Sequence, residues 1–247
     1  MVLNEQGEGG LQIKCFGSLI HPQVVLTAAH CLEKTTTIYV RAGVWNIRDP
    51  NERYSTQKVN LIIKHPYFKL TSLKYDAALL ITEEPFVLTE NVNTACLACE
   101  PTPAYPSATN DCVATGWGAD TLDGKFSDKM RKIKFLPLDD EYCETTFRSS
   151  RLGKWFKLHP SFLCAQNKYG SDTCDGNGGA PLVCPVPGQQ RRYELVGLAS
   201  WGIGCADSKP SVFTDIPEVK SWIDQQFDEL GFSKDYYTYD YGKQGVF

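Results

Sequence analysis

Short runs of β-branched and aromatic residues recur along this chain, separated by segments rich in Gly, Pro, Asn, Asp and Ser. Runs of this length between turn signals are typical of β-strands, and many of them in series favour an all-β sandwich or barrel. The clearest strand candidates are Thr36–Arg41, Val59–Ile63, Asp76–Ile81, Arg131–Phe135, Tyr193–Ser200 and Ser211–Thr214.

The length of 247 residues suffices for one large domain or for two fused halves. The loop Cys99–Asn110 contains three prolines and is the best candidate for a boundary between halves. We therefore expect one domain over residues 1–230, with halves of about 1–108 and 109–230, followed by a polar, Tyr-rich tail over 231–247. This tail contains little that could be buried.

One helix is predicted near the C-terminus. Asp215 can cap it, Pro217 suits its first turn, and Gly231 is a natural stop. Between these signals the apolar residues recur at helical spacing and form one face. They are Val219, Trp222, Ile223, Phe227 and Leu230.

Charge and cysteine content restrict the class of protein. The formal net charge is −4, so no basic surface points to nucleic acid. No apolar run approaches the roughly 20 residues of a membrane-spanning helix. Ten cysteines favour an oxidising compartment, and hence a secreted, extracellular protein. Because the N-terminus is too polar for a signal peptide, we expect the chain to be part of a longer secreted protein.

Three motifs stand in the chain order of a catalytic triad. They are Thr-Ala-Ala-His-Cys around His30, Tyr-Asp-Ala-Ala-Leu-Leu around Asp76, and a Gly-rich turn before Pro-Leu-Val-Cys at residues 174–184. His30 would be the base and Asp76 the group that orients it. The position of the nucleophilic serine is Gly178. Without a hydroxyl no acyl-enzyme can form, so no peptidase activity is expected.

These motifs resemble those of the chymotrypsin-fold serine proteases, from the first residues to Phe227. Within that family the chain is similar to the arthropod clip-domain serine protease homologues, a non-catalytic group that assists prophenoloxidase activation. The stretches that carry the resemblance are Gly17–Pro22, Thr27–Cys31, Glu90–Asn93, Ala114–Gly118, Arg151–Gly153, Leu158–Phe162 and Trp201–Cys205.

The resemblance implies two six-stranded antiparallel β-barrels of the trypsin-like fold, a cleft between them and a C-terminal helix. Four disulfides are implied, namely Cys15–Cys31, Cys112–Cys184, Cys143–Cys164 and Cys174–Cys205. In such proteins Cys96 normally tethers an N-terminal segment, whereas Cys99 departs from the pattern. A local bridge between these two cysteines, or two links to sequence outside the chain, would explain them.

Further site remnants follow from the resemblance. Gly176 and Asn177 belong to the oxyanion loop, where active members carry Asp in place of Asn177 and pair it with a new N-terminal amine. Asp172 matches the base of a pocket that selects Arg or Lys. Either a residual pocket for basic residues or an inherited buried carboxylate would explain it. The remaining pocket positions are Ser200, Trp201, Gly202 and Ser211, of which Ser211 replaces a glycine and would narrow the slot.

No metal and no cofactor are expected. His21, His65 and His159 are scattered and are interpreted as surface or loop-packing residues. The loop Gly43–Arg53 resembles the calcium loop of some trypsins, but Val44 stands where a carboxylate ligand is expected, so calcium is not predicted.

Three functions compete. The leading hypothesis is a catalytically inactive, secreted binding or cofactor protein in an arthropod innate-immune cascade. Its partners would be proteins such as a protease or prophenoloxidase, and self-association stays open. An active trypsin-like endopeptidase with an atypical nucleophile is the second, although Ser171 and Thr173 lie outside the matching slot. The third is a decoy that binds protease substrates or inhibitors, which Asp172 keeps open. The loop Phe147–Leu158, rich in Arg and Lys, is the candidate contact surface.

Overall fold

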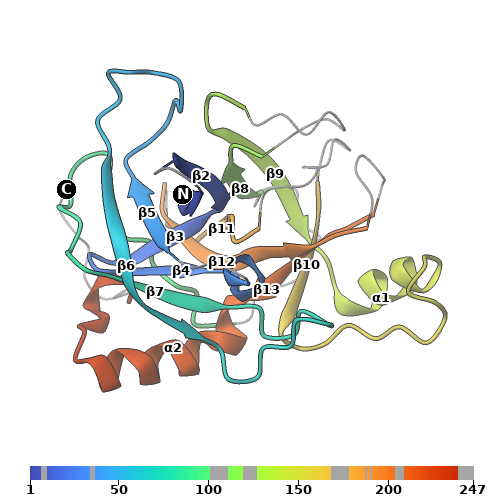
Figure 1. Ribbon diagram of the computed structural model, residues 1–247. Coiled ribbons are helices and arrows are strands. Elements are labelled where there is room, and N and C mark those ends of the chain that lie inside the picture. Colours follow the sequence, from blue (N-terminus) through green and yellow to red (C-terminus); the bar gives the residue numbers. More distant parts are fainter. Residues whose placement is uncertain are drawn as a thin grey trace.

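The computed structural model in Figure 1 consists of antiparallel β-strands, with helices at its periphery. The described residues are 1–6, 10–33, 37–100, 111–118, 127–167, 178–186, 188, 189, 191–203 and 209–238. No helix in this described part of the chain is long and apolar enough to cross a membrane.

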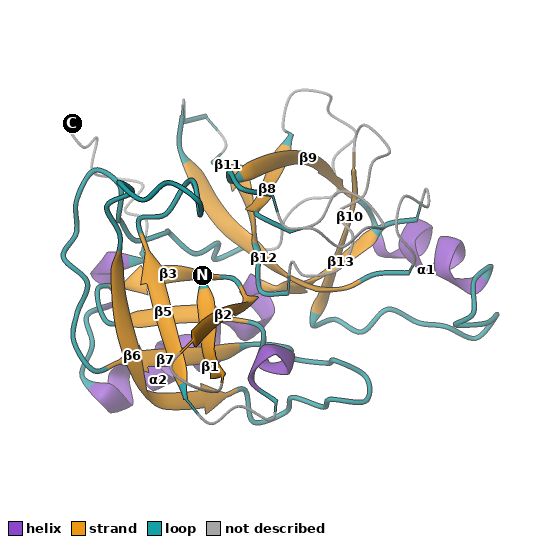
Figure 2. Ribbon diagram, turned by 45° about the horizontal axis from the view of Figure 1, so that its top comes forward, coloured by secondary structure: helices purple, strands orange, loops and turns teal. Residues whose placement is uncertain are grey.

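The first sheet has the strand order β2-β1-β5-β6-β7-β4-β3. Only Phe16 separates β2 from β3, so one bent stretch of chain supplies both edges of the sheet and the sheet curls back on itself (Figure 2). Counting that stretch once gives six strands. The bounds are β1 Val2–Gln6, β2 Gly10–Cys15, β3 Gly17–His21, β4 Val24–Thr27, β5 Ile38–Ala42, β6 Ser55–Lys64 and β7 Ala78–Thr82.

The second sheet is a closed six-stranded barrel in the order β10-β13-β12-β11-β8-β9. Closure pairs every strand on both sides, which removes exposed edges. The bounds are β8 Cys112–Gly116, β9 Arg131–Pro137, β10 Phe162–Asn167, β11 Pro181–Pro185, β12 Tyr193–Trp201 and β13 Ser211–Asp215. The two six-stranded antiparallel units expected for a trypsin-like fold are therefore confirmed.

The central strands of the first sheet explain how the two halves hold together. β4 and β7 are buried along their whole length, as continuous apolar runs predict. Leu26 and Leu79 from these strands share one core cluster with Leu195 and Leu198 of β12. Trp222 from the C-terminal helix completes this cluster, so both barrels and the helix are packed around the same apolar core.

The predicted C-terminal helix is present as α2, Ile216–Leu230. It ends at Gly231, whose φ of 71° is the left-handed conformation that glycine adopts without strain. Two details of the prediction were wrong. The Asp215 side chain forms no capping hydrogen bond with the described backbone, and Leu230 is 38% exposed and lies outside the buried face.

A second helix, α1 at Asp140–Arg148, was not predicted. Asp139 caps it by accepting a hydrogen bond from the Tyr142 backbone N–H at 2.7 Å. Cys143 and Phe147 form its buried face. The sequence signal was present, since an Asp stands before an acidic first turn and two apolar residues follow four positions apart.

The segment after α2 is partly buried, contrary to the expectation that it had little to bury. A short 3₁₀ helix, η2 at Lys234–Tyr236, leads to Tyr237, which is 0% exposed. The Tyr237 hydroxyl donates a hydrogen bond to Asp224 Oδ1 at 2.7 Å. The Tyr237 backbone carbonyl accepts a hydrogen bond from the Leu97 N–H at 2.9 Å. Residues 239–247 lie outside the described part.

Candidate functional site: a base and its orienting acid beside a glycine

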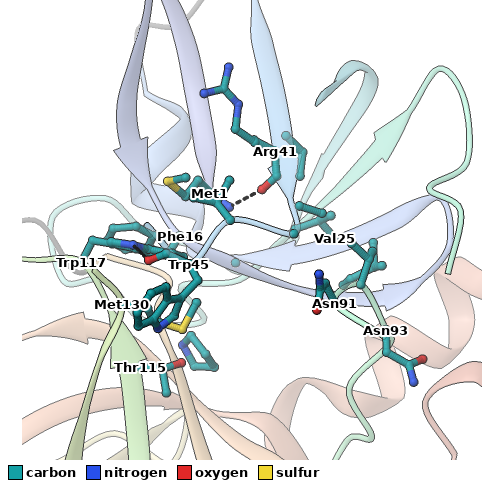
Figure 3. Close-up of a pocket in the computed structure, with 18 of the residues that line it drawn as sticks. Met1, Phe16, Val25, Arg41, Trp45, Asn91, Asn93, Thr115, Trp117 and Met130 are labelled. Atoms are coloured by element: carbon teal, nitrogen blue, oxygen red, sulfur yellow. Dashed lines mark hydrogen bonds between the residues drawn. The ribbon is translucent and has the colours of Figure 1, made fainter. Parts of the chain in front are cut away.

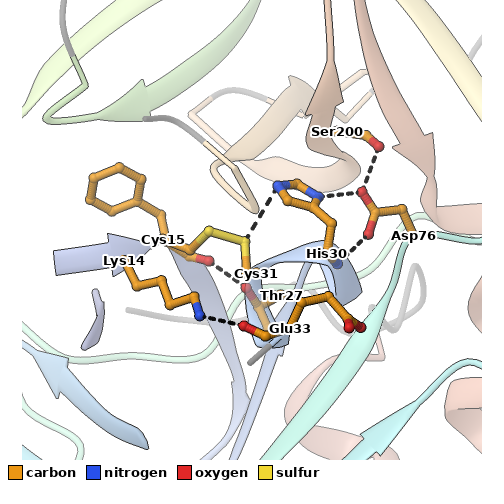
Figure 4. The surroundings of a disulfide bond; sticks show 9 residues. Lys14, Cys15, Thr27, His30, Cys31, Glu33, Asp76 and Ser200 are labelled. Atoms are coloured by element: carbon orange, nitrogen blue, oxygen red, sulfur yellow. Dashed lines mark hydrogen bonds and ion pairs between the residues drawn. A yellow bond between two sulfur atoms is a disulfide. The ribbon is translucent and has the colours of Figure 1, made fainter. Parts of the chain in front are cut away.

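His30 and Asp76 are brought together at the junction of the two barrels, as their motifs predict (Figure 4). His30 lies in the short 3₁₀ helix η1, Ala29–Leu32, and Asp76 lies two residues before the start of β7. The His30 Nδ1–H donates to Asp76 Oδ2 at 2.6 Å, and the His30 backbone N–H donates to Oδ1 at 2.8 Å. Asp76 is 0% exposed, so this carboxylate fixes both the position and the orientation of the imidazole.

Ser200 has a role that the sequence did not reveal. The resemblance placed it on the strand that backs a substrate, and its hydroxyl donates to Asp76 Oδ2 at 2.6 Å. Thr214 Oγ1 donates to the Asp76 carbonyl at 2.9 Å. Together with the two bonds from His30, the Ser200 bond leaves both oxygens of the buried carboxylate hydrogen-bonded, as a buried charge requires.

Gly178 lies against the free edge of the imidazole. A Cβ added at this glycine would meet His30 Nε2 at 2.6 Å, Cys15 Sγ at 3.0 Å and Cys31 Sγ at 3.1 Å. Real Cβ contacts are not found below about 3.0 Å, so a side chain here would have to displace the ring or the disulfide. The expected nucleophile position therefore lacks both the hydroxyl and the space for one.

The turn after Gly178 is held on both sides. The Phe16 N–H donates to the Gly178 carbonyl at 2.9 Å, and the Gly179 N–H donates to the Ala199 carbonyl at 2.8 Å. Gly179 has a φ of +72°, and a Cβ there would approach the Phe16 carbonyl to 2.4 Å. Only glycine fits this position. These contacts fix the backbone of Gly178 at its short distance from His30.

The disulfide beside His30 also bears on metal binding. Ligand atoms of Cys15, His30 and Cys31 lie within 4.8 Å of one another. Both sulfurs are joined in the Cys15–Cys31 disulfide, so neither is available as a thiolate ligand. The expectation of no metal is compatible with this chemistry.

The remaining pocket positions are divided between the described and the undescribed parts of the chain. Trp201 packs edge-to-face against Phe162 at 5.7 Å and near Phe147 at 5.2 Å. Gly202 is exposed, and Ser211 lies on β13 opposite Ala165. The positions that lie outside the described residues are Asp172, Gly176 and Asn177.

Three of the four implied disulfides are present. They are Cys15–Cys31, Cys112–Cys184 and Cys143–Cys164. The fourth implied pair, Cys174–Cys205, lies outside the described residues. Among the described cysteines, Cys96 and Cys99 form no disulfide, so the local bridge between them is absent. Burial raises the pKa of the half-buried Cys96 thiol, which lowers its reactivity.

The loop resembling a calcium loop is held by protein contacts. Both carboxylate oxygens of Glu52 accept hydrogen bonds from backbone N–H groups, those of Trp45 at 3.0 Å and Asn46 at 3.2 Å. This carboxylate therefore closes the loop by itself and does not require a cation to do so.

The other histidines pack against aromatic rings. His65 is 6% exposed and stacks on Tyr75 with ring centroids 4.7 Å apart, and burial lowers its pKa to about 4. His21 packs against Phe232 at 4.6 Å, and the His159 Nδ1 lies 2.9 Å from the Ser161 hydroxyl. These contacts agree with the interpretation of the three histidines as packing residues.

A cavity of about 430 Å³ is lined by residues of both barrels (Figure 3). Phe16 and Trp117 stack at 5.5 Å along its wall, and the Trp117 Nε1–H donates to the Trp45 carbonyl at 3.0 Å. Its described lining includes the Glu52 carboxylate and the Thr115 hydroxyl but neither His nor Cys.

The fold and the His30–Asp76 pair define the class of protein. Two antiparallel barrels hold a buried acid and an oriented base at their junction, which is the scaffold of the chymotrypsin-type serine proteases. The sequence profile of the Trypsin family matches residues 2–223, and the chain belongs to this family.

The relatives of the chain include proteins named as inactive serine proteases. Phenoloxidase-activating factor 2 of Galleria mellonella is 38% identical over 96% of this chain and 80% of its own length. Inactive CLIP domain-containing serine protease A8 of Anopheles gambiae is 32% identical over 84% of this chain and 57% of its own length. Inactive CLIP domain-containing serine protease A28 of Anopheles gambiae is 30% identical over 91% of this chain and 59% of its own length. The chain therefore spans less than two thirds of the last two relatives.

Proposed function

We propose that this chain is a non-catalytic serine protease homologue, secreted from the cell, that acts by binding proteins in a cascade leading to phenoloxidase activation. The observation that carries the proposal is Gly178, which presents no hydroxyl to His30 and leaves no room for a side chain. Acyl transfer requires a nucleophile within hydrogen-bond reach of the base, so the retained His30–Asp76 pair has nothing to deprotonate.

The rest of the molecule supports a binding role. The core, the disulfides and the buried Asp76 network maintain a rigid frame. A rigid frame presents loops in fixed positions, and binding loops depend on this. The names of the similar proteins from Galleria mellonella and Anopheles gambiae fit a contact role in phenoloxidase activation. The described disulfides fit secretion.

Two measurements test this proposal together. A fluorophosphonate probe, which labels activated serines, should leave the protein unlabelled, while trypsin in the same tube reacts fully. In a reconstituted assay with purified prophenoloxidase and its activating protease, adding the full protein should change the rate of activation or the size of the product complex. Stoichiometric labelling would restore the active-protease hypothesis. An unlabelled protein without effect on activation would exclude the cofactor role and favour the decoy hypothesis.

A further inference from the structure

One loop departs from the acidic balance of the protein. The segment between α1 and β10, residues 149–158, carries Arg151, Lys154 and Lys157 and no acidic residue, whereas the whole chain has a net charge of −4. All three basic side chains are exposed, and none forms a salt bridge with a described residue. The loop projects beside α1 at the edge of the molecule (Figure 1). We call these residues the basic loop.

An aromatic side chain lies at the tip of the basic loop. Trp155 is 83% exposed, the highest exposure among the large apolar side chains of the described residues. Lys154 Nζ lies 5.1 Å from the centre of its ring, which places a cation and an apolar surface side by side. Trp is enriched at protein interfaces, and here it stands within a run of exposed basic side chains, so the basic loop combines an apolar anchor with positive charge.

Contacts with α1 hold the basic loop in place. Phe156 packs edge-to-face on Phe147 at 5.6 Å and joins the cluster that contains Trp201. The Leu158 N–H donates to Glu144 Oε1 at 3.0 Å, and Arg148 Nε donates to the Phe156 carbonyl at 3.0 Å. Because Phe156 and Leu158 anchor the loop directly after Trp155, the loop presents this side chain at low entropic cost, which favours tight binding.

We propose that the basic loop binds an acidic segment of a partner protein, with Trp155 as the apolar anchor and Arg151, Lys154 and Lys157 as its charge complement. This inference rests on the proposed function and names the surface through which it operates. Trp and Arg dominate the energy of protein interfaces, and basic side chains at the rim steer acidic partners.

The neighbouring helix favours a narrow protein segment over an anionic membrane. Asp139 caps α1, and Asp140 and Glu141 lie in its first turn. An anionic membrane presents negative charge over a wide area, so it would also be repelled by these carboxylates and by the acidic balance of the chain, whose net charge is −4. An extended acidic peptide can contact the basic loop alone.

The test measures binding separately from activation. Purified prophenoloxidase and a random copolymer of Glu and Tyr serve as probes, and vesicles of phosphatidylcholine with phosphatidylserine serve as the membrane arm. The loop variants are Trp155→Ala and the double variant Lys154→Glu/Lys157→Glu. The matched controls are Tyr67→Ala, an exposed aromatic on another loop, and Lys69→Glu/Lys132→Glu, which changes the charge equally.

We expect both loop variants to weaken binding of prophenoloxidase and of the copolymer by roughly 10- to 30-fold, with little change in the controls. If loop and control variants bind equally, the surface is wrong, although the proposed function stands provided that activation is still enhanced. If the unmodified protein neither binds prophenoloxidase nor alters activation, the proposed function fails. Weaker copolymer binding by the loop variants than by the controls would then still support the basic loop as a binding surface, and equal binding would exclude it. Stronger loop-dependent binding to the vesicles than to the copolymer would overturn the assignment to a protein segment.

Discussion

At the residue scale, the close contact between Gly178 and His30 means that the site lacks space for a side chain as well as a hydroxyl. His30 is held by two hydrogen bonds to the buried Asp76, and the Cys15–Cys31 disulfide lies directly beside its Nε2. The Cys31 sulfur is 3.7 Å from that nitrogen. The imidazole is therefore fixed against the backbone of Gly178. Restoring the chemistry requires space as well as a serine.

We predict that Gly178→Ser does not restore peptidase activity and lowers the free energy of unfolding. The added Cβ would displace His30 or the disulfide, and overpacking of this kind costs about 1–3 kcal/mol of unfolding free energy. Gly178→Ala should cost about the same, because the clash arises from Cβ and not from the hydroxyl. Urea denaturation and fluorophosphonate labelling measure the two effects.

The cause is tested by removing the imidazole. In a Gly178→Ala background, His30→Ala should recover part of the lost stability, giving a coupling free energy on the order of 1 kcal/mol in a double-mutant cycle. Additive effects of the two substitutions on the free energy of unfolding would show that the space at Gly178 is larger than the structure indicates. A Gly178→Ser protein that is fully labelled by the probe and fully stable would show the same.

Asp215 makes stability depend on pH. Burial, followed by the nearby Glu218 and Asp140, raises the pKa of this carboxyl to about 7, and its Oδ1 meets no donor among the described residues. The folded protein then holds a proton that the unfolded chain releases above its ordinary pKa of 3.8. Linkage requires the unfolding free energy to fall as pH rises from about 4 to about 7.

We predict that Asp215→Asn raises the free energy of unfolding at pH 8 and leaves it unchanged near pH 3.5. One pKa unit corresponds to about 1.4 kcal/mol, and the positive end of α2 offsets part of the cost, so a gain of about 1–3 kcal/mol is expected at pH 8. Thermal or urea denaturation over this pH range measures it. Asp49→Asn, on an exposed loop, is the control; a gain independent of pH would refute the role of the Asp215 charge.

At the scale of elements, the segment after α2 is a structural anchor. The Tyr237 ring packs edge-to-face on Phe227 at 4.8 Å, and its hydroxyl binds Asp224. Through the Leu97 N–H, it also holds the segment that carries Cys96 and Cys99. The composition of this segment concealed the anchor, because one buried Tyr among polar residues looks like the exposed ones around it.

We predict that Tyr237→Phe lowers the free energy of unfolding by about 1–2 kcal/mol through loss of the hydrogen bond to Asp224. Tyr237→Ala should cost about 3–5 kcal/mol and speed the reaction of the half-buried Cys96 with a thiol reagent. Tyr236→Phe, whose side chain is 40% exposed, serves as the control. Unchanged Cys96 reactivity in Tyr237→Ala would show that the anchor does not protect this segment.

Sequence patterns predicted some elements and missed others for physical reasons. β7 was found because its apolar residues form a continuous run, and α2 because its apolar residues recur at helical spacing. β1 and β2 were missed because their strands mix polar and apolar residues and depend on pairing with each other. The motifs located His30, Asp76 and Gly178, whereas the lack of space at Gly178 depends on packing at the scale of a few tenths of an ångström, which no residue pattern records.

At the scale of the whole molecule, one core cluster joins the two barrels and α2. Leu79 from the first sheet, Leu198 from the second and Ile223 from α2 belong to the same buried cluster. Each barrel also has a core cluster of its own, so the coupling of the two halves depends on the shared cluster at their junction. A frame of this kind keeps the basic loop and the His30–Asp76 pair in fixed positions without any requirement for catalysis.

We predict that the protein unfolds in a single cooperative step and that damage to one half weakens both. Phe135→Ala, a cavity in the second barrel, should lower the free energy of unfolding by about 3–5 kcal/mol. Hydrogen exchange under native conditions should then accelerate equally in peptides from β7 and β12, because their slowest amides exchange through the same global opening. Ile223→Ala, at the junction, should give the same uniform pattern. Faster exchange confined to β12 in Phe135→Ala would show instead that the barrels are independent units, and a frame made of such units could not hold the junction at Gly178 closed.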